Sequence, residues 1–366
     1  MSRKIADYGV RVGRLTPGPL DKITDVPGVT VGHATIADAR HRTGVTVVLP
    51  CEDNMFRRKL TASAFVLNGF GKTQGLVQIG ELGQLETPIA LTNTLNVGLV
   101  HDALVSYMAA RCTADGTAMH SINPVVGECN DAHLNAIADR VVREEHVRAA
   151  IDSACRAFEE GCVGAGAGTI CHGLKGGIGS ASRLLPIGER TYTLGVLVQS
   201  NHGCLEELTV RGRRVGEEIL RARRAKASQA PQAPQTSQVS QAAREASHEP
   251  AQDRGSIMVV VATDLPVLDR QLGRILRRCA AGLARCGSYY GHGSGDVMIG
   301  FTTQNRVPHE AGDAVLTHQA IVEPLLELAF RAAADATEEA VLNSLVAAEE
   351  TVAPDGTVYE SLSKYL

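Results

Sequence analysis

Gly255-Ser-Ile-Met-Val-Val-Val-Ala-Thr-Asp264 is the most strand-like stretch of this 366-residue chain, and it begins abruptly. Its β-branched content and its length suit a strand that is buried on both faces. The preceding segment, about residues 226–254, is dense in Gln, Ala, Ser and Pro and has almost no large apolar side chain. Such a composition cannot offset the entropy cost of ordering, so we expect an exposed, disordered linker there.

The linker has two interpretations. A tether between two domains explains its composition most simply. Against this, only residues 256–366 follow, and they start with a buried-type strand rather than a polar domain boundary. Such a strand is expected to join a sheet with the N-terminal part of the chain. Cleavage of the chain at the C-terminal end of the linker would explain why a long linker connects two pieces of one sheet. This predicts fragments 1–255 and 256–366 that form one integrated catalytic domain.

Cleavage before Ser256 would create an N-terminal nucleophile. The side-chain oxygen attacks the preceding carbonyl, an ester replaces the peptide bond, and water opens the ester. Gly255 suits the strained backbone that this attack needs. Afterwards Ser256 carries both a hydroxyl and an α-amine, and an α-amine titrates near pH 8, so it can act as a base. The Gly-Ser pair alone is a weak signal, because Gly179-Ser180, Gly287-Ser288 and Gly293-Ser294 repeat it.

Strand-like and helix-like segments alternate along the rest of the chain. Strands are predicted at 44–49, 63–68, 88–93, 194–199, 256–262 and 296–301, and helices at 97–111, 144–160, 268–283 and within 319–345. In the helix at 268–283 the apolar residues form one face, and Arg270, Arg274, Arg277 and Arg278 lie largely elsewhere. This mixture predicts a layered α/β or α+β protein of one large or two coupled domains.

Composition excludes several classes of function. The net charge is −4, aromatic residues make up 4% and there is no Trp, which argues against nucleic-acid binding. No apolar segment follows the basic N-terminus and no run of 18 apolar residues occurs, so we expect neither a signal peptide nor a membrane span, and a cytoplasmic location. The nine cysteines show no Cys-x-x-Cys spacing, which favours reduced buried thiols over disulfides or a metal site.

Other short motifs are ambiguous by themselves. Gly291-His-Gly-Ser294-Gly-Asp296 can present a hydroxyl and a carboxylate, or can be a plain turn into a strand. Asn201 ends a strand, where its amide can donate to an oxyanion or simply form a turn. The glycine-rich segments 164–169 and 175–180 lack the phosphate-loop pattern, so close backbone approach is their expected use. His202, like His101, is interpreted as an ordinary, hydrogen-bonded residue.

Taken together and in this order, these segments resemble the family of L-aminopeptidase/D-esterase-amidases (DmpA-like) and β-peptidyl aminopeptidases. The likeness covers nearly the whole chain. It is carried by segments 23–33, 87–94, 124–131, 164–169, 175–179, 196–201, 255–264 and 293–296. The resemblance implies a four-layer αββα core of the kind shared with ornithine acetyltransferases and similar to N-terminal-nucleophile hydrolases.

The resemblance also implies roles for individual residues. Ser256 matches the nucleophile, with its own amine as the base, and Asn201 matches the oxyanion-hole asparagine. Ser294 and Asp296 match the pair that orients the nucleophile, although members often carry Glu at the position of Asp296. Glu128 is a candidate contact for the substrate amine, and Asn130 falls where some members have a Tyr near the substrate.

No metal or organic cofactor is implied. The expected substrate is a short peptide, amide or ester with a free amino group, from which one N-terminal residue is released. The two fragments are expected to stay associated and to assemble further, commonly into tetramers. Two alternatives stay open: an acyltransferase of the ornithine acetyltransferase type, which uses Thr at the cut, and an unprocessed binding protein in which the linker is only a tether.

Overall fold

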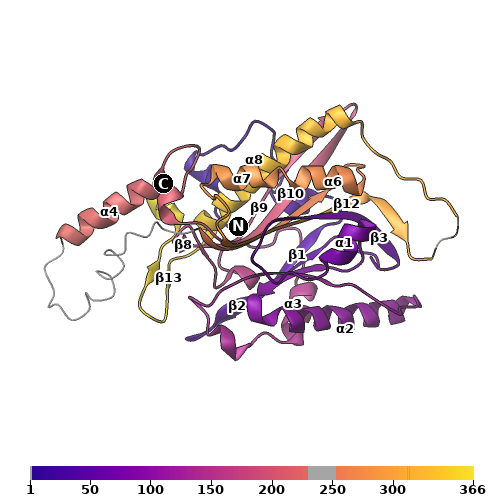
Figure 1. The fold of residues 1–366 in the computed structure, drawn as a ribbon, viewed down its shortest axis with the longest axis horizontal. Coiled ribbons are helices and arrows are strands. Elements are labelled where there is room, and N and C mark those ends of the chain that lie inside the picture. The colour runs from indigo at the N-terminus through magenta and orange to yellow at the C-terminus, as the bar shows by residue number, and fades with distance from the viewer. Residues whose placement is uncertain (1, 230–252, 311, 313) are drawn as a thin grey trace.

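The computed structural model describes residues 2–229, 253–310, 312 and 314–366 (Figure 1). The expected linker, about 226–254, therefore lies mostly outside the described residues. At its margins the structure differs from the expectation. Residues 226–229 are the last turn of helix α4 (Val215–Gln229), and strand β11 already begins at Arg254.

Two sheets form the centre of the molecule. The larger has the order β4-β3-β12-β11-β10-β9 and contains β3 (Arg58–Gly69), β4 (Gln84–Leu85), β9 (Gly177–Ile187), β10 (Arg190–Asn201), β11 (Arg254–Thr263) and β12 (Gly293–Pro308). The smaller has the order β1-β2-β5-β6 and contains β1 (Thr30–Ala37), β2 (Arg42–Leu49), β5 (Ile89–Asn93) and β6 (Val125–Cys129). Two short hairpins complete the described strands: β7 (Ile170–Cys171) with β8 (Leu174–Lys175), and β13 (Thr351–Val352) with β14 (Val358–Tyr359).

Helices cover the outer face of each sheet, which gives the four layers αββα (Figure 1). The larger sheet packs against α6 (Asp269–Leu276), α7 (Cys279–Arg285) and α8 (Leu326–Ala347), and the smaller against α2 (Val97–Asp115) and α3 (Glu144–Asp152). A short helix, α1 (Leu76–Leu82), lies beside β3. The αββα architecture expected from the resemblance is confirmed.

Strand β11 shows why this sequence forms the central layer. Ile257, Val259 and Val261 belong to the core under the helices, whereas Met258, Val260 and Ala262 belong to the core between the sheets. Because side chains alternate across a strand, a continuous apolar run fills both cores at once. Burying each of the large side chains contributes roughly 1.5–3 kcal/mol. As the sequence predicts, β11 joins a sheet with the N-terminal part, paired antiparallel with β10 and parallel with β12.

Most predicted elements form, but three helices were predicted too long. The helix expected at 144–160 ends at Asp152, because the backbone of Cys155 pairs with Val31 at the edge of β1. The helix expected at 268–283 is two helices, α6 and α7, which meet at 277–278. In 319–345 the chain is first extended, because the Ile321 N–H donates to the Pro266 carbonyl, and α8 starts only at Leu326.

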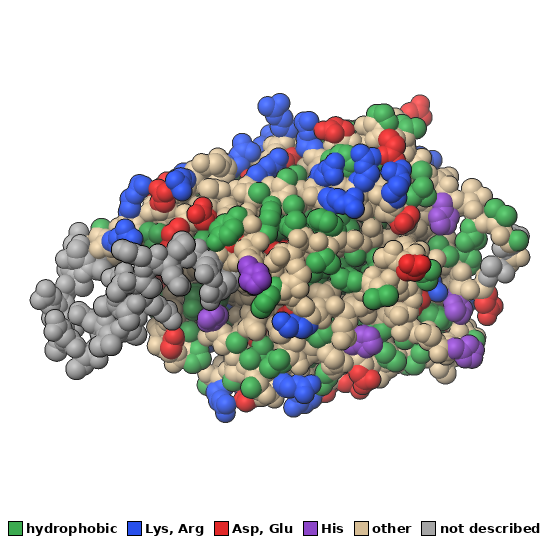
Figure 2. Space-filling view, in the orientation of Figure 1, with side chains coloured by type: hydrophobic (Ala, Val, Ile, Leu, Met, Phe, Trp, Pro, Cys, Tyr) green, Lys and Arg blue, Asp and Glu red, His purple; other side chains and the backbone are tan. Residues whose placement is uncertain are grey.

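The basic side of the predicted helix at 268–283 faces outward. Figure 2 shows Lys and Arg side chains gathered over the α6–α7 side of the molecule. Their charge is partly balanced, since Arg270 and Arg274 both pair with Glu323. Arg278 lies over the ring of Phe330. Within the described part of the chain, no helix combines the length and apolarity that a bilayer crossing requires.

Candidate active site

A cavity of about 480 Å³ opens where β10 and β6 end and β11 begins. It is lined by Phe70, Lys72, Thr94, Glu128, Asn130, His133, Ile170, Gly173, Asn201, Gly203, Gly255, Ser256, Gly293 and Tyr359. Both sheets contribute, so residues far apart in the sequence meet here. Of the predicted site residues, Gly255, Ser256, Asn201, Glu128 and Asn130 line this one cavity.

The Gly255–Ser256 bond lies at the entry to β11. Gly255 has φ 121°, in the region that side-chain-bearing residues rarely adopt. A Cβ built on Gly255 would lie 2.0 Å from the carbonyl oxygen of Asn201, so only glycine fits. The Ser256 hydroxyl donates to the Gly255 carbonyl oxygen at 2.7 Å. The nucleophile candidate therefore contacts the peptide group that precedes it.

Asn201 is held opposite Ser256 by the ladder between β10 and β11, in which the two residues are register partners. Its Oδ1 accepts a hydrogen bond from the Ile170 N–H at 2.9 Å. Because Oδ1 accepts this hydrogen bond, the Nδ2 group on the other side of the amide can donate to another partner. A fixed amide donor beside a nucleophile is the arrangement that stabilises an oxyanion.

Ser294 and Asp296 lie behind Ser256, on the neighbouring parallel strand β12. The Ser294 hydroxyl donates to Asp296 Oδ1 at 2.7 Å, and both side chains are fully buried. Burial raises the pKa of Asp296 to about 6, although the hydrogen bond from Ser294 opposes this. The second oxygen, Oδ2, has no hydrogen-bond partner among the described residues. Asp296 can therefore accept a further proton or hydrogen bond on the strand next to that of Ser256.

Glu128, on β6, supplies a buried carboxylate to the same cavity. Its Oε1 accepts from the Lys72 N–H at 3.0 Å, and its Oε2 accepts from the Thr94 hydroxyl. Asn130 is exposed at the rim, where its side chain caps the Ala132 N–H. Lys72 and Thr94 were not predicted. Their place in the site depends on the contact of the loop after β3 and of the end of β5 with β6, which the sequence does not show.

Asp253 is another residue that the sequence did not reveal. It is buried, and its carboxylate accepts hydrogen bonds from the Gly203 N–H, the Ser288 hydroxyl and the N–H groups of Tyr289 and Tyr290. It lies two residues before Gly255, so it fixes the segment that leads into the Gly255–Ser256 bond. No sequence signal marked it, because it stands inside a stretch with the composition of a linker.

A larger cavity, of about 950 Å³, lies elsewhere, between the N-terminal segment and the end of α8. None of the predicted site residues lines it, and two of its several ionic groups, Lys22 and Glu160, pair with each other at 3.0 Å. The smaller cavity is therefore the candidate active site. Among the described residues, the side chains close enough to share a metal ion are Cys171, His172 and His202, next to this cavity but buried.

Known proteins resemble this chain over nearly its whole length. The pattern of peptidase family S58 matches residues 21–359. The β-peptidyl aminopeptidase BapA of Sphingosinicella xenopeptidilytica is 36% identical over 357 residues, 94% of this chain and 85% of that protein. The solved structure of the PH0078 protein from Pyrococcus horikoshii OT3 is 40% identical with a TM-score of 0.87, covering 99% of this chain and 96% of that one.

A second solved structure is the L-aminopeptidase D-Ala-esterase/amidase of Ochrobactrum anthropi, described as a prototype of the serine aminopeptidases and a new variant of the Ntn hydrolase fold. It is 34% identical with a TM-score of 0.85, and the match covers 99% of this chain and 98% of that one. These similarities extend over both sheets and over both sides of the Gly255–Ser256 bond.

Proposed function

This chain belongs to peptidase family S58, and we propose that it cuts itself between Gly255 and Ser256 and then acts as an aminopeptidase through the new N-terminal Ser256. One observation carries the proposal. The Ser256 hydroxyl is 2.7 Å from the carbonyl oxygen of Gly255, a residue held beside an open cavity at a φ of 121° that only glycine readily adopts.

The self-cleavage step follows from that contact. Ser256 Oγ attacks the Gly255 carbonyl carbon, the Oγ proton passes to the departing nitrogen of Ser256, and an ester replaces the amide. Water then hydrolyses the ester. Gly255 gains a carboxylate, and Ser256 regains its hydroxyl and acquires a free α-amine. The products are fragments 1–255 and 256–366, which we propose remain associated because β11 lies between β10 and β12.

In the mature enzyme the same hydroxyl attacks a substrate. The α-amine of Ser256 takes the hydroxyl proton and later gives it to the leaving amine, because an α-amine titrates close to neutral pH. Asn201 donates through Nδ2 to the oxyanion that forms on the substrate carbonyl. Ser294 and Asp296 orient Ser256, and the unpartnered Oδ2 of Asp296 is available to its new amine.

The cavity supports a short substrate with a free amino group. Its volume of about 480 Å³ accommodates a small peptide or amide. Glu128 supplies the buried carboxylate that attracts an ammonium group, and Asn130 forms part of the rim that the rest of the substrate passes. We therefore propose removal of one N-terminal residue at a time from short peptides, amides or esters, with residues of the β-amino type among the candidates.

The acyltransferase alternative uses Thr as its nucleophile, and Thr263 does not fit that role. It lies at the far end of β11, it is buried, and its hydroxyl donates to the Thr193 carbonyl at 2.8 Å. The two activities differ in whether water or an amine accepts the acyl group. Partition of product between hydrolysis and transfer to an added amine therefore distinguishes them.

The first test is the intact mass of the wild type beside Ser256→Ala and Ser256→Cys. We expect wild type to give fragments 1–255 and 256–366, Ser256→Ala to stay whole, and Ser256→Cys to be cut because it keeps a nucleophile. The cleaved wild type should also release the first residue of short peptides. A wild-type chain that stays whole after prolonged incubation, or a Ser256→Ala chain cut at the same bond, would contradict the proposal.

A further inference from the structure

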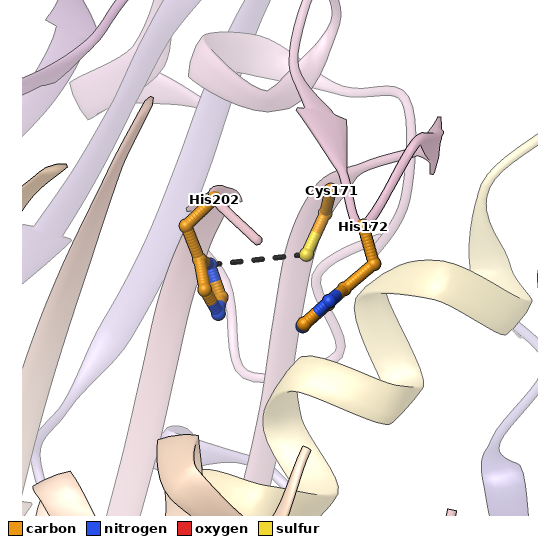
Figure 3. A group of neighbouring side chains, drawn as sticks. All are labelled: Cys171, His172 and His202. Atoms are coloured by element: carbon orange, nitrogen blue, oxygen red, sulfur yellow. Dashed lines mark hydrogen bonds between the residues drawn. The ribbon is translucent and has the colours of Figure 1, made fainter. Parts of the chain in front are cut away.

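Three metal-ligating side chains meet beside the catalytic cavity without contributing to its proposed chemistry. Cys171 ends β7, His172 follows it in the turn to β8, and His202 directly follows the end of β10. Figure 3 shows that the side chains of Cys171 and His202 point toward each other, with His172 close beside them. Thirty-one positions separate Cys171 from His202, so no spacing motif marked the group.

The geometry is that of a compact ligand set. Cys171 Sγ and His202 Nδ1 are 3.8 Å apart, and the two imidazole centroids are 5.2 Å apart with the rings at 67°. One ligand atom from each residue lies within 4.8 Å of the other two. Cys171 and His172 are fully buried and His202 is 1% exposed. Thiolate and imidazole together are typical ligands of zinc and other thiophilic metals.

Two imidazole nitrogens in this group have no hydrogen-bond partner among the described residues: Nε2 of His172 and Nε2 of His202. His172 Nδ1 lies 3.1 Å from the Cys204 carbonyl oxygen, which can only accept, so Nδ1 carries the proton. His172 Nε2 is therefore a buried lone pair that nothing in the described structure satisfies. A carbonyl that fixes the tautomer and leaves the other nitrogen to a metal is the usual arrangement around a histidine ligand.

The local charges also favour a cation. The carboxylate of Asp253 acts electrostatically on all three groups.

We propose that Cys171, His172 and His202 bind one thiophilic divalent cation of the zinc type. The metal replaces the thiol proton, which leaves to solvent, and a metal–sulfur bond forms without any change of oxidation state. Two imidazole nitrogens complete three protein ligands. This site is separate from the nucleophile and is additional to the proposed function.

Binding would stiffen the support of Asn201. Cys171 follows Ile170, whose N–H fixes Asn201 Oδ1, and His202 follows Asn201 itself. A cation bound to both strands therefore ties together the donor and the acceptor of that hydrogen bond. Since the metal binds the folded state, loading also raises the unfolding temperature.

The experiment uses the purified protein, first freed of metal by a chelator and then incubated at length with Co²⁺ or Zn²⁺. We expect one equivalent of metal per chain, a sulfur-to-cobalt charge-transfer band with Co²⁺, and a higher unfolding temperature with Zn²⁺. Cys171→Ser should lose the cobalt–sulfur band. His172→Gln should weaken metal affinity at least about 100-fold, the upper end of what losing a partner of a metal ligand costs.

Cys155→Ser is the matched control, because that thiol is exposed and lies outside the group, and it should keep both the band and the stoichiometry. If Cys171→Ser does not fold, the affinity of His172→Gln decides. The proposal is overturned if the wild type takes up no stoichiometric metal, or if the band persists in Cys171→Ser. Metal content and the cobalt–sulfur band are measured without peptidase activity. They therefore test the metal site even if the proposed peptidase function is wrong.

Discussion

Replacing Asp253 by Ala tests whether the segment before the scissile bond is held in place for self-cleavage. Its carboxylate receives the Gly203 N–H at 2.9 Å, the Ser288 hydroxyl at 2.7 Å and the Tyr289 and Tyr290 N–H groups at 3.1 Å each. Burial opposes its ionisation, but these hydrogen bonds hold the pKa of Asp253 below its usual value. The side chain is therefore a charged anchor two residues from Gly255.

The size of the effect follows from what the anchor stabilises. A hydrogen bond to a charged group contributes about 1.5–3 kcal/mol net. If Asp253→Ala loses the equivalent of one such hydrogen bond, the fraction of chains in the attacking geometry falls roughly 10- to 150-fold, since each 1.36 kcal/mol is tenfold in rate.

The assay is a time course of self-cleavage in cell-free synthesis, stopped at intervals and analysed by intact mass. Asp253→Ala should be cut roughly 10- to 150-fold more slowly than wild type. Once cut, it should hydrolyse peptides with near-normal kcat and KM, because Asp253 is then close to the new C-terminus of fragment 1–255. Asp253→Asn is the matched control. The Asn side chain keeps the size of Asp and one oxygen acceptor, but its NH₂ group faces N–H or O–H donors that it cannot accept from. Its cleavage rate should therefore fall between those of wild type and Asp253→Ala.

Cleavage of Asp253→Ala at the wild-type rate would refute the reasoning, because the anchor would then be irrelevant to the geometry of attack. Slow cleavage combined with a global loss of stability would also count against it. Denaturant unfolding of Asp253→Ala in a Ser256→Ala chain measures that stability separately.

Three further predictions concern the catalytic cavity. Asn201→Ala should lower kcat roughly 10²- to 10³-fold with little change in KM, measured on fully cleaved enzyme, because an oxyanion donor acts mainly in the transition state; an equal rise in KM would contradict this role. Glu128→Gln should lower kcat/KM roughly 10- to 100-fold for substrates with a free amine, and an unchanged value would remove Glu128 from amine binding. Asp296→Asn, made in a Ser256→Ala chain, should leave stability unchanged at pH 4 and raise it by up to about 3 kcal/mol at pH 8. Because the pKa of Asp296 is raised from 3.8 to about 6 in the folded state, the parent chain loses stability as the pH rises through 6, whereas the Asn variant cannot ionise and does not. A difference in unfolding free energy between variant and parent that is the same at both pH values would exclude this.

The layers of the fold could be predicted because apolar periodicity is strong in the strands that fill them. Strand β11 is apolar at every position from Ile257 to Ala262, which only a doubly covered strand requires. Helix ends were predicted less well. Cys155 continues the helical pattern of α3, yet pairing with Val31 at a sheet edge decides its backbone, and such long-range pairing leaves no mark in local sequence.

For the candidate site, sequence identified the residues that belong to compact motifs, and the structure brings Ser256, Asn201 and Glu128 to one cavity. Their catalytic roles remain predictions. Asp253 and the Cys171–His172–His202 group could not be found in this way. Each depends on contacts between segments that are distant in the chain, and their residue types are unremarkable where they stand.

The position of β11 has a consequence for how this protein can be made. The strands on both sides of the scissile bond are interleaved: β3 and β10, from before it, flank the pair β11 and β12, from after it. An uncut chain finds this arrangement in a unimolecular reaction. After the cut, the two pieces would have to meet again, and refolding would become bimolecular and dependent on concentration. We therefore expect the cleaved enzyme to refold poorly once it has unfolded. Its lifetime in the folded state then depends on the rate of unfolding rather than on the equilibrium between folded and unfolded states.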